Sequence, residues 1–230
     1  MSRRLVIPDI HGCPQSLEAL LDEVAPNTED TLYFLGDYID RGPDSAGVLE
    51  LLMRLKEEGF RLKLLRGNHE ENFMRAFQDW ADEPGLFQRF VTRINKAGNL
   101  LDAQGHPIQR YWEFMEGLAY YFELPEAILV HAGLKFQDED PFADRSALLE
   151  LRQMVYAGDK VGDRMIIHGH VPTSIGEIEA ALEKKGPVIP LDNGCVFARM
   201  HKVHDHTQLG HLLCLDLDAW QLYRIPNQDF

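Results

Sequence analysis

The sequence is poor in cysteine, in positive charge and in long hydrophobic runs, and each shortage excludes a class of protein. Three cysteines among 230 residues cannot build a disulfide framework and show no paired metal-ligand spacing, so a reducing, cytoplasmic location is expected. Lysine and arginine total 23 against 37 acidic residues, and the formal net charge of −14 argues against nucleic acid or anionic lipid as a partner. No apolar run approaches a membrane span, and none near the start is long enough for a signal peptide.

What the chain does contain is an alternation of short apolar runs with amphipathic segments. Strands are predicted at 5–7, 31–35 and 61–65, and helices at 14–25 and 45–58, where apolar residues recur at helical spacing. This order predicts a parallel sheet whose strands are joined by crossover helices.

A mainly helical segment at about 70–118 is expected as an insertion packed over the sheet. Strand patterns return after it, at 120–124, 127–130, 165–167 and 188–191, and then as a closing hairpin at 212–217 and 220–225. No repeat, low-complexity tract or linker is visible, so residues 1–230 are interpreted as one mixed α/β domain.

Polar residues able to bind metals stand where the predicted strands end. They lie in five segments: Asp9-Ile10-His11-Gly12, Gly36-Asp37-Tyr38-Ile39-Asp40-Arg41-Gly42, Arg66-Gly67-Asn68-His69-Glu70, His131-Ala132-Gly133 and His168-Gly169-His170. Ligands of an open parallel sheet bind at the carboxyl ends of its strands, so all five segments are expected to meet at one edge.

The side chains in these segments suit a site that holds two metal ions. Asp9 and His11 can face one cation, and Asp37 can bridge two. The second cation can be completed by three further ligands: Asn68, His131 and one histidine of the last segment, His168 or His170. Mixed nitrogen and oxygen ligands favour Mn²⁺, Fe or Zn²⁺ over Ca²⁺ or Mg²⁺. Two such ions, about 3.5–4 Å apart, clamp an in-line displacement at phosphorus and lower the pKa of a shared water.

Three further side chains of the same segments fit roles beyond metal binding. Arg41 offers a bidentate fork to phosphate oxygens. His69 is placed to protonate the leaving oxygen, and Asp40 can hold its ring by accepting from the other ring N–H.

In their order, the five segments resemble the motifs of the PPP-type serine/threonine phosphatases, the metal-dependent phosphoprotein phosphatases among the calcineurin-like metallophosphoesterases. Asp40-Arg41-Gly42 and Gly67-Asn68-His69-Glu70 are the most specific matches, and Gly169-His170-Val171-Pro172 matches the last motif. The length is similar to that of the compact bacterial and bacteriophage members. The resemblance implies an αββα sandwich, in which helices flank two central mixed sheets and the metals lie at strand ends.

The resemblance also implies a role for each matching residue. The first metal ion would be held by Asp9, His11 and Asp37, and the second by Asp37, Asn68, His131 and His170. His69, paired with Asp40, would be the acid catalyst. Phosphate would be bound by Arg41 and, by position alone, by Arg152. The expected cofactors are two divalent ions, with Mn²⁺ first and Fe or Zn²⁺ as alternatives.

The expected activity is hydrolysis of phosphoserine and phosphothreonine esters in phosphoproteins, with phosphotyrosine esters as a further candidate, by direct attack of a metal-bridging hydroxide. The alternative is a bis(5'-nucleosyl)-tetraphosphate hydrolase, a sister branch with the same metal centre. Its members share the alanine of His131-Ala132-Gly133 but usually carry Asp where this chain has Glu70. A third hypothesis, a non-catalytic metal-binding protein, is disfavoured by the complete ligand set and by His69.

Several residues near these motifs are given structural interpretations. Glu70 is interpreted as an acid of a helix first turn, Arg66 as a salt-bridge residue, and Cys13 and Cys195 as small buried residues. Ten histidines exceed what the site uses, and the excess gathers late in the chain. A solvated loop, with a metal site as the alternative, is predicted for His201, His204, His206 and His211.

Overall fold

Alternation of apolar side chains along short strands builds the first of two sheets. The computed structural model describes residues 2–199 and 208–230. In β1, Leu5 and Ile7 face one core and Val6 faces another, as the two-residue period of a strand requires. This sheet has the order β3-β2-β1-β8-β9. Its strands are β1 (Arg4–Ile7), β2 (Thr31–Phe34), β3 (Arg61–Leu64), β8 (His211–Asp216) and β9 (Gln221–Pro226).

The predicted parallel connection and closing hairpin are both confirmed. β1 pairs in parallel with β2, and β2 with β3, whereas β8 runs antiparallel to β1 and forms a hairpin with β9. The register places Ile7 beside Phe34 and Phe34 beside Leu64. The three parallel strands therefore end level with one another, and the loops that follow them start from one edge.

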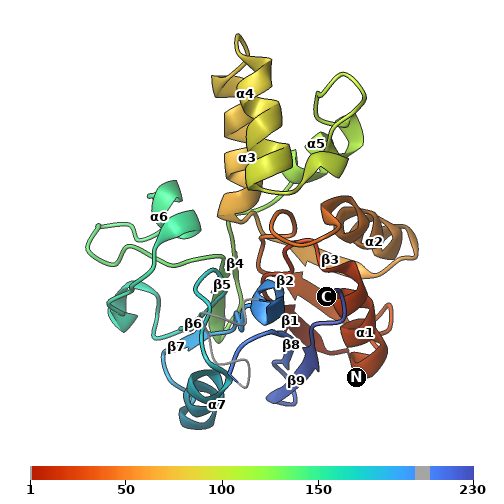
Figure 1. The fold of residues 1–230 in the computed structure, drawn as a ribbon. Coiled ribbons are helices and arrows are strands. Elements are labelled where there is room, and N and C mark those ends of the chain that lie inside the picture. The colour runs from red at the N-terminus through yellow and green to blue at the C-terminus, as the bar shows by residue number, and fades with distance from the viewer. Residues whose placement is uncertain (1, 200–207) are drawn as a thin grey trace.

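The second sheet has the order β4-β5-β6-β7 and faces the first across a shared core (Figure 1). Its strands are β4 (Tyr121–Glu123), β5 (Ala127–Val130), β6 (Met165–His168) and β7 (Val188–Pro190). β5, β6 and β7 are parallel, and β4 is antiparallel to β5. Val6 and Leu35 from the first sheet pack with Leu129 and Ile167 from the second.

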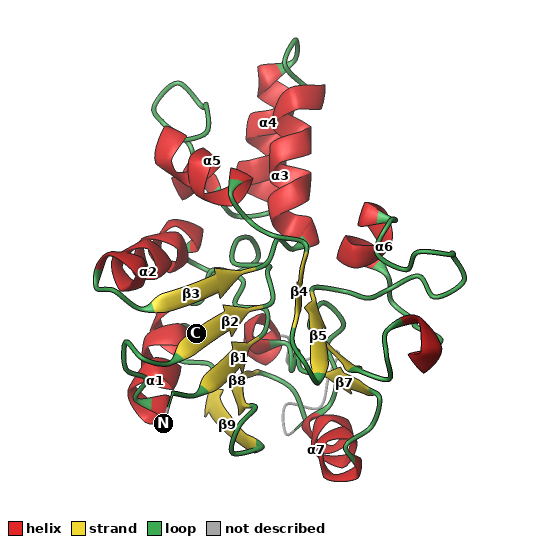
Figure 2. Ribbon diagram, turned by 180° about the vertical axis from the view of Figure 1, so that it is seen from behind, coloured by secondary structure: helices red, strands yellow, loops and turns green. Residues whose placement is uncertain are grey.

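Helices cover the outer faces of the sandwich (Figure 2). α1 (Pro14–Val24) and α2 (Ser45–Glu57) lie on the first sheet, α6 (Arg145–Glu150) lies beside the second, and α7 (Ile175–Lys184) packs on β7. The two mixed sheets flanked by helices confirm the expected αββα sandwich. The segments of α6 and α7 carried no prediction. Two short 3₁₀ turns complete the sandwich: η3 (Gly158–Lys160), and η4 (Cys195–Arg199), which packs beside β8.

A helical unit rises above the sandwich, at the top of Figure 1. It consists of α3 (Asn68–Asp79), α4 (Pro84–Arg89), the π-helical turn η1 (Phe90–Ile94), the 3₁₀ turn η2 (Gly98–Leu100) and α5 (Gln109–Glu116). Aromatic rings hold it together, with Phe77 centroids 5.2 Å from Phe87 and 5.4 Å from Trp112. These rings join the same core as α1 and α2. Among the described residues, no helix has both the length and the apolar character needed to cross a membrane.

Candidate metal centre and phosphate site

The candidate site lies where strands of both sheets end. Loops after β1, β2 and β3 carry the first three predicted segments, and loops after β5 and β6 carry the other two. The segments therefore converge, but from two facing sheets and not from one edge of a single open sheet. The expectation of one edge was wrong because the chain starts a second sheet at β4.

Two trios of possible metal ligands share the carboxylate of Asp37. In each trio the ligand atoms lie within 4.8 Å of one another, and the trios are His11, Asp37 and His69, and Asp37, His131 and His170. Asp37 Oδ2 is 3.5 Å from His11 Nε2, whereas Oδ1 is 3.5 Å from His131 Nε2. The two oxygens of one carboxylate thus face different imidazoles, which is the arrangement a bridging ligand needs.

Asn68 and Asp9 stand beside these trios in different ways. Asn68 Oδ1 lies 3.1 Å from His131 Nε2 and 3.0 Å from His170 Nδ1, so it faces the second trio. Asp9 is a member of neither trio, and its carboxylate accepts from the backbone N–H of His170 at 3.0 and 3.1 Å. His69 occupies the place in the first trio that was predicted for Asp9. The allocation of each side chain to a particular metal ion stays a prediction.

The backbone around the site is strained in a way that brings these side chains together. His11, Asp37, Asp40, Arg41 and His170 have φ angles of 50°, 51°, 72°, 68° and 65°, in the left-handed region that L-residues seldom adopt. Glycine is needed at one close approach, because a Cβ on residue 67 would meet Asp37 Oδ1 at 2.1 Å. Such strain persists only where the surrounding structure holds it in place.

Glu70 supplies much of that support. Its buried carboxylate accepts from the backbone N–H groups of Asp37 at 3.0 Å, Tyr38 at 2.8 Å and Gly67 at 2.9 Å. Glu70 was predicted as an acid of a helix first turn, and it does stand in the first turn of α3. It also ties the loop after β2 to the loop after β3, which the sequence did not indicate.

Burial sets the protonation of the histidines. Desolvation lowers the pKa of His11 and His131, and it lowers that of His170 to about 4, so these rings are neutral near pH 7. The tautomers are directed by backbone carbonyls, because Nδ1 lies 2.9 Å from Ile39 O in His11 and 2.9 Å from Leu35 O in His131. In both rings Nε2 is then unprotonated and can give its lone pair to a metal ion.

Three buried carboxylates, those of Asp9, Asp37 and Asp192, lie close together at the site. Burial raises the pKa of Asp9, with the charges of Asp192 and Asp37 adding to the rise. Burial likewise raises the pKa of Asp192 to about 7. For Asp37, burial opposes ionisation but the nearby rings of His131, His69 and His11 outweigh it and hold its pKa well below the usual range. Carboxylates packed this closely favour cations between them.

The donor set therefore fits divalent metal ions. Neutral imidazole nitrogens, carboxylate oxygens and the Asn68 amide oxygen are ligands typical of Mn²⁺, Fe and Zn²⁺. Which of these ions binds stays a prediction.

His69 and Asp40 form the pair predicted for acid catalysis. His69 Nδ1 lies 2.6 Å from Asp40 Oδ2, and Asp40 is fully buried. Burial lowers the pKa of His69, but the charges of Asp37 and Asp40 outweigh it and hold that pKa above its ordinary value. The ring can therefore carry a proton at neutral pH, as a general acid must.

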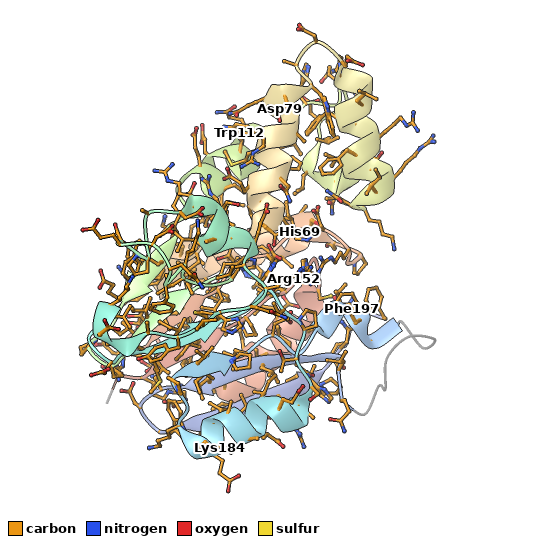
Figure 3. The ribbon with its side chains drawn as sticks, turned by 90° about the vertical axis from the view of Figure 1, so that its left-hand side faces the viewer. His69, Asp79, Trp112, Arg152, Lys184 and Phe197 are labelled. Atoms are coloured by element: carbon orange, nitrogen blue, oxygen red, sulfur yellow. The ribbon has the colours of Figure 1, made fainter. Side chains whose placement is uncertain are left out.

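Arg41 and Arg152 come together at one cavity. The cavity of about 490 Å³ is lined by both arginines and by His170. Arg41 Nη1 lies 2.7 Å from His11 Nε2, so its guanidinium reaches the first trio. Figure 3 shows His69, Arg152 and Phe197 in the middle of the molecule, although they come from three distant segments of the chain. Arg152, matched by position alone, is thus brought beside the residues it was predicted to assist.

Of the remaining predicted residues, the structure describes some, and others lie outside the described ranges. His168 is buried, its Nδ1 lies 3.0 Å from Gly169 O, and it joins neither trio, which favours His170 as the ligand. His211 begins β8, and its Nδ1 lies 3.1 Å from Asn193 Oδ1. The rest of that histidine cluster, His201, His204 and His206, lies outside the described residues.

Two residues at the site, Asp192 and Phe197, were not among the predicted catalytic, metal-binding or phosphate-binding residues. Asp192 is buried after β7, and its Oδ1 accepts from the N–H of Gly194 at 2.7 Å. Phe197, on η4, lines the cavity with its ring 5.6 Å from the Arg41 guanidinium. Asp192 carries the same signal as the five segments, an acid directly after a strand. Phe197 offers no such signal, since an isolated aromatic residue is usually part of a core.

The chain belongs to the calcineurin-like phosphoesterase family, whose model matches residues 2–189. It is 30% identical over 130 residues to the symmetrical bis(5'-nucleosyl)-tetraphosphatase of Wigglesworthia glossinidia brevipalpis, a match that covers 56% of this chain and 44% of that protein. Its identity to the Paracidovorax citrulli protein of the same name is 44% over 132 residues, covering 56% and 43%. The matches thus span less than half the length of these curated relatives.

Solved structures agree on the fold. A serine/threonine phosphatase from Saccharomyces cerevisiae superposes with a TM-score of 0.59 at 17% identity, over 97% of this chain and 79% of that one. At this identity the likeness concerns the fold alone. The comparisons therefore give the family and the fold, and the activity and substrate of this chain are separate questions.

Proposed function

We propose that the protein hydrolyses the tetraphosphate bridge of a bis(5'-nucleosyl) tetraphosphate. The observation that carries the hydrolytic chemistry is Asp37 shared between two ligand trios, beside the arginine-lined cavity. Support for the substrate class comes from the names of the curated relatives, to which the identity is 30% and 44% over about half of this chain. The alternative reading of the motifs thus replaces protein phosphatase as the first candidate.

In the proposed reaction, the chain holds the substrate with its arginines. Arg41 and Arg152 neutralise oxygens of the phosphate that is attacked and orient it in the cavity. Divalent metal ions would be held by Asp9, His11, Asp37, Asn68, His131 and His170, and when bound they would supply Lewis acidity and lower the pKa of a water. In the displacement, a water oxygen bonds to phosphorus as the bond from phosphorus to the leaving oxygen breaks, and the proton that the water loses passes to solvent.

His69 completes the proton balance in this proposal. Its Nε2 gives a proton to the leaving oxygen, while the hydrogen bond of 2.6 Å from Nδ1 to Asp40 stabilises the charged ring beforehand. Neither residue forms a covalent bond to the substrate.

The test is a substrate panel measured with Mn²⁺ and again with excess chelator. Diadenosine tetraphosphate is expected to be hydrolysed with a kcat/KM at least tenfold above that for any phosphopeptide. The products, separated by ion-exchange chromatography, are expected to be two molecules of ADP, as symmetrical cleavage requires. Full activity under chelation would contradict the metal mechanism, and preference for phosphopeptides would contradict the substrate.

The second candidate is a phosphatase for phosphoserine and phosphothreonine proteins. It is favoured by Glu70, where the tetraphosphatase branch usually carries Asp, and by the specific match of Gly67-Asn68-His69-Glu70 to the PPP motif. The same panel decides between the two candidates.

A further inference from the structure

Beyond its two arginines, the cavity has walls of a different character. Val171, Pro172, Phe197 and Leu209 form its apolar sides, and Ser174 and Gln208 add a hydroxyl and an amide. None of these six residues has a role in the reaction proposed above. A cavity lined by two guanidinium groups and by apolar side chains fits a ligand with an anionic part and a flat apolar part.

The aromatic wall is built next to the phosphate-binding end. The Phe197 ring lies 5.6 Å from the guanidinium of Arg41, so a ligand group attached to a bound phosphate lies within reach of the ring. Gly194 brings this ring and Pro172 together, because a Cβ there would meet Phe197 Cδ2 at 2.7 Å and Pro172 Cβ at 3.4 Å. Both rings therefore crowd over one glycine and present a continuous surface.

A buried amide holds these walls in position. Asn193 donates from Nδ2 to Thr173 O at 2.9 Å and to Gln208 O at 2.7 Å. Asn193 thereby joins the segment that carries Pro172 to the one that carries Gln208, and it lies directly before the glycine under Phe197. These hydrogen bonds fix the two segments relative to each other, and a fixed site loses less entropy on binding.

We propose that Phe197, Pro172 and Gln208 form a nucleobase subsite, in which the base stacks on the Phe197 ring while Arg41 and Arg152 hold the adjoining phosphates. The proposal rests on the proposed function and names the residues that select its substrate class. Stacking on an aromatic ring tolerates any base, because every base has a π-face. The Gln208 amide offers one acceptor and two donors to a base edge.

The test compares two competitive inhibitors that differ only in the nucleoside. ADP and inorganic pyrophosphate are titrated against hydrolysis of p-nitrophenyl phosphate by the Mn²⁺-loaded protein. The readout is the ratio of the two inhibition constants, which does not depend on the basal rate of a variant. We expect ADP to bind at least tenfold more tightly than pyrophosphate in the unchanged protein.

Phe197→Ala is expected to reduce that preference about tenfold, and Phe197→Tyr to retain it, because the phenol ring still stacks. Phe90→Ala is the matched control, since Phe90 packs on Trp80 in the helical unit with centroids 5.4 Å apart, and it should keep the ratio. A ratio unchanged by Phe197→Ala, or no preference for ADP at the outset, would overturn the subsite.

The outcome is separable from that of the proposed function. If Phe197 governs the ADP preference but diadenosine tetraphosphate is not hydrolysed, the subsite stands and the proposed substrate fails. If the tetraphosphate is hydrolysed and Phe197→Ala leaves its KM unchanged, the proposed function stands and the subsite fails.

Discussion

At the scale of single residues, chemistry at this site depends on where two oxygens of one carboxylate point. Asp37 Oδ1 faces His131 and Oδ2 faces His11, and a left-handed backbone at Asp37 places both. The neutral state of these rings follows from burial, which removes the water that would stabilise their charged forms. Replacing a single side chain therefore tests one step of the reaction at a time.

His69→Asn is expected to slow alkyl phosphate hydrolysis by about 10²–10⁴-fold. Aryl phosphates should lose much less, because an aryl leaving group departs without full protonation. The measurement is kcat for a matched pair of alkyl and aryl monoesters. Equal losses on both substrates would show that His69 is not the proton donor.

The pH dependence of kcat/KM should report the same ring. Although burial opposes protonation, Asp37 and Asp40 hold the pKa of His69 above its ordinary value of 6.5. The active, protonated form therefore persists above pH 6.5 and is lost as the pH rises through the raised pKa. Asp40→Asn removes one of the charges that raise it, so the alkaline limb should move to lower pH. An unmoved limb would argue against the pairing seen at 2.6 Å.

At the scale of elements, the site is held by contacts between loops and by the foot of α3. Glu70 binds backbone N–H groups of two strand-end loops, and Arg66 pairs with Glu71 at 2.8 Å while donating to Met115 O at 2.9 Å. The salt bridge predicted for Arg66 is thus confirmed and reaches α3, whereas the hydrogen bond to Met115 joins the end of β3 to α5. These contacts couple the helical unit to the metal centre.

Glu70→Gln is expected to lower the free energy of unfolding by about 1–3 kcal/mol, because the new amide group turns N–H donors toward N–H donors in a buried place. Chemical denaturation measures the loss. Glu116→Gln, an exposed change on the last residue of α5, is the control and should stay within about 0.5 kcal/mol. A Glu70 variant as stable as the control would mean that the loops hold their shape without this carboxylate.

At the scale of the whole molecule, a protein with a net charge of −14 holds a small anion-binding site between its two sheets. The buried Asp9, Asp37 and Asp192 add to that negative charge, so attraction of a phosphate depends on bound cations and on Arg41 and Arg152. Metal binding should therefore also stabilise the fold, since it relieves the repulsion among these carboxylates.

Addition of Mn²⁺ to chelator-treated protein is expected to raise the melting temperature. At a concentration of 100 times Kd the gain is about 2.7 kcal/mol, or roughly 5–10 °C for a chain of this size. Asp37→Asn should abolish the shift, and Asp218→Asn, on the surface hairpin turn, should keep it. Scanning calorimetry provides the measurement, and an equal shift in the Asp37 variant would contradict the shared ligand.

Local patterns in the sequence were enough to predict the strands, the crossover helices and most of the site. Asp9, His11, Asp37, Asn68 and His131 each follow an apolar run, and such runs become strands because burial of alternate faces stabilises them. The two-residue period of a strand and the polar residues at its end are patterns among neighbouring residues, so they can be recognised in the sequence before the fold is known. The short helix α7 was missed because its Ser174 and Glu177 capping box is a weak signal in isolation.

The sequence by itself determined which chemistry the protein carries, because imidazole, carboxylate, amide and guanidinium groups are matters of residue type. Only the tertiary structure decided that two facing sheets supply the site, that His69 joins the trio of His11, and that Phe197 lies beside Arg41. These contacts join residues far apart in the chain. Their distances depend on how the sheets pack across the shared core, and no local pattern encodes that packing.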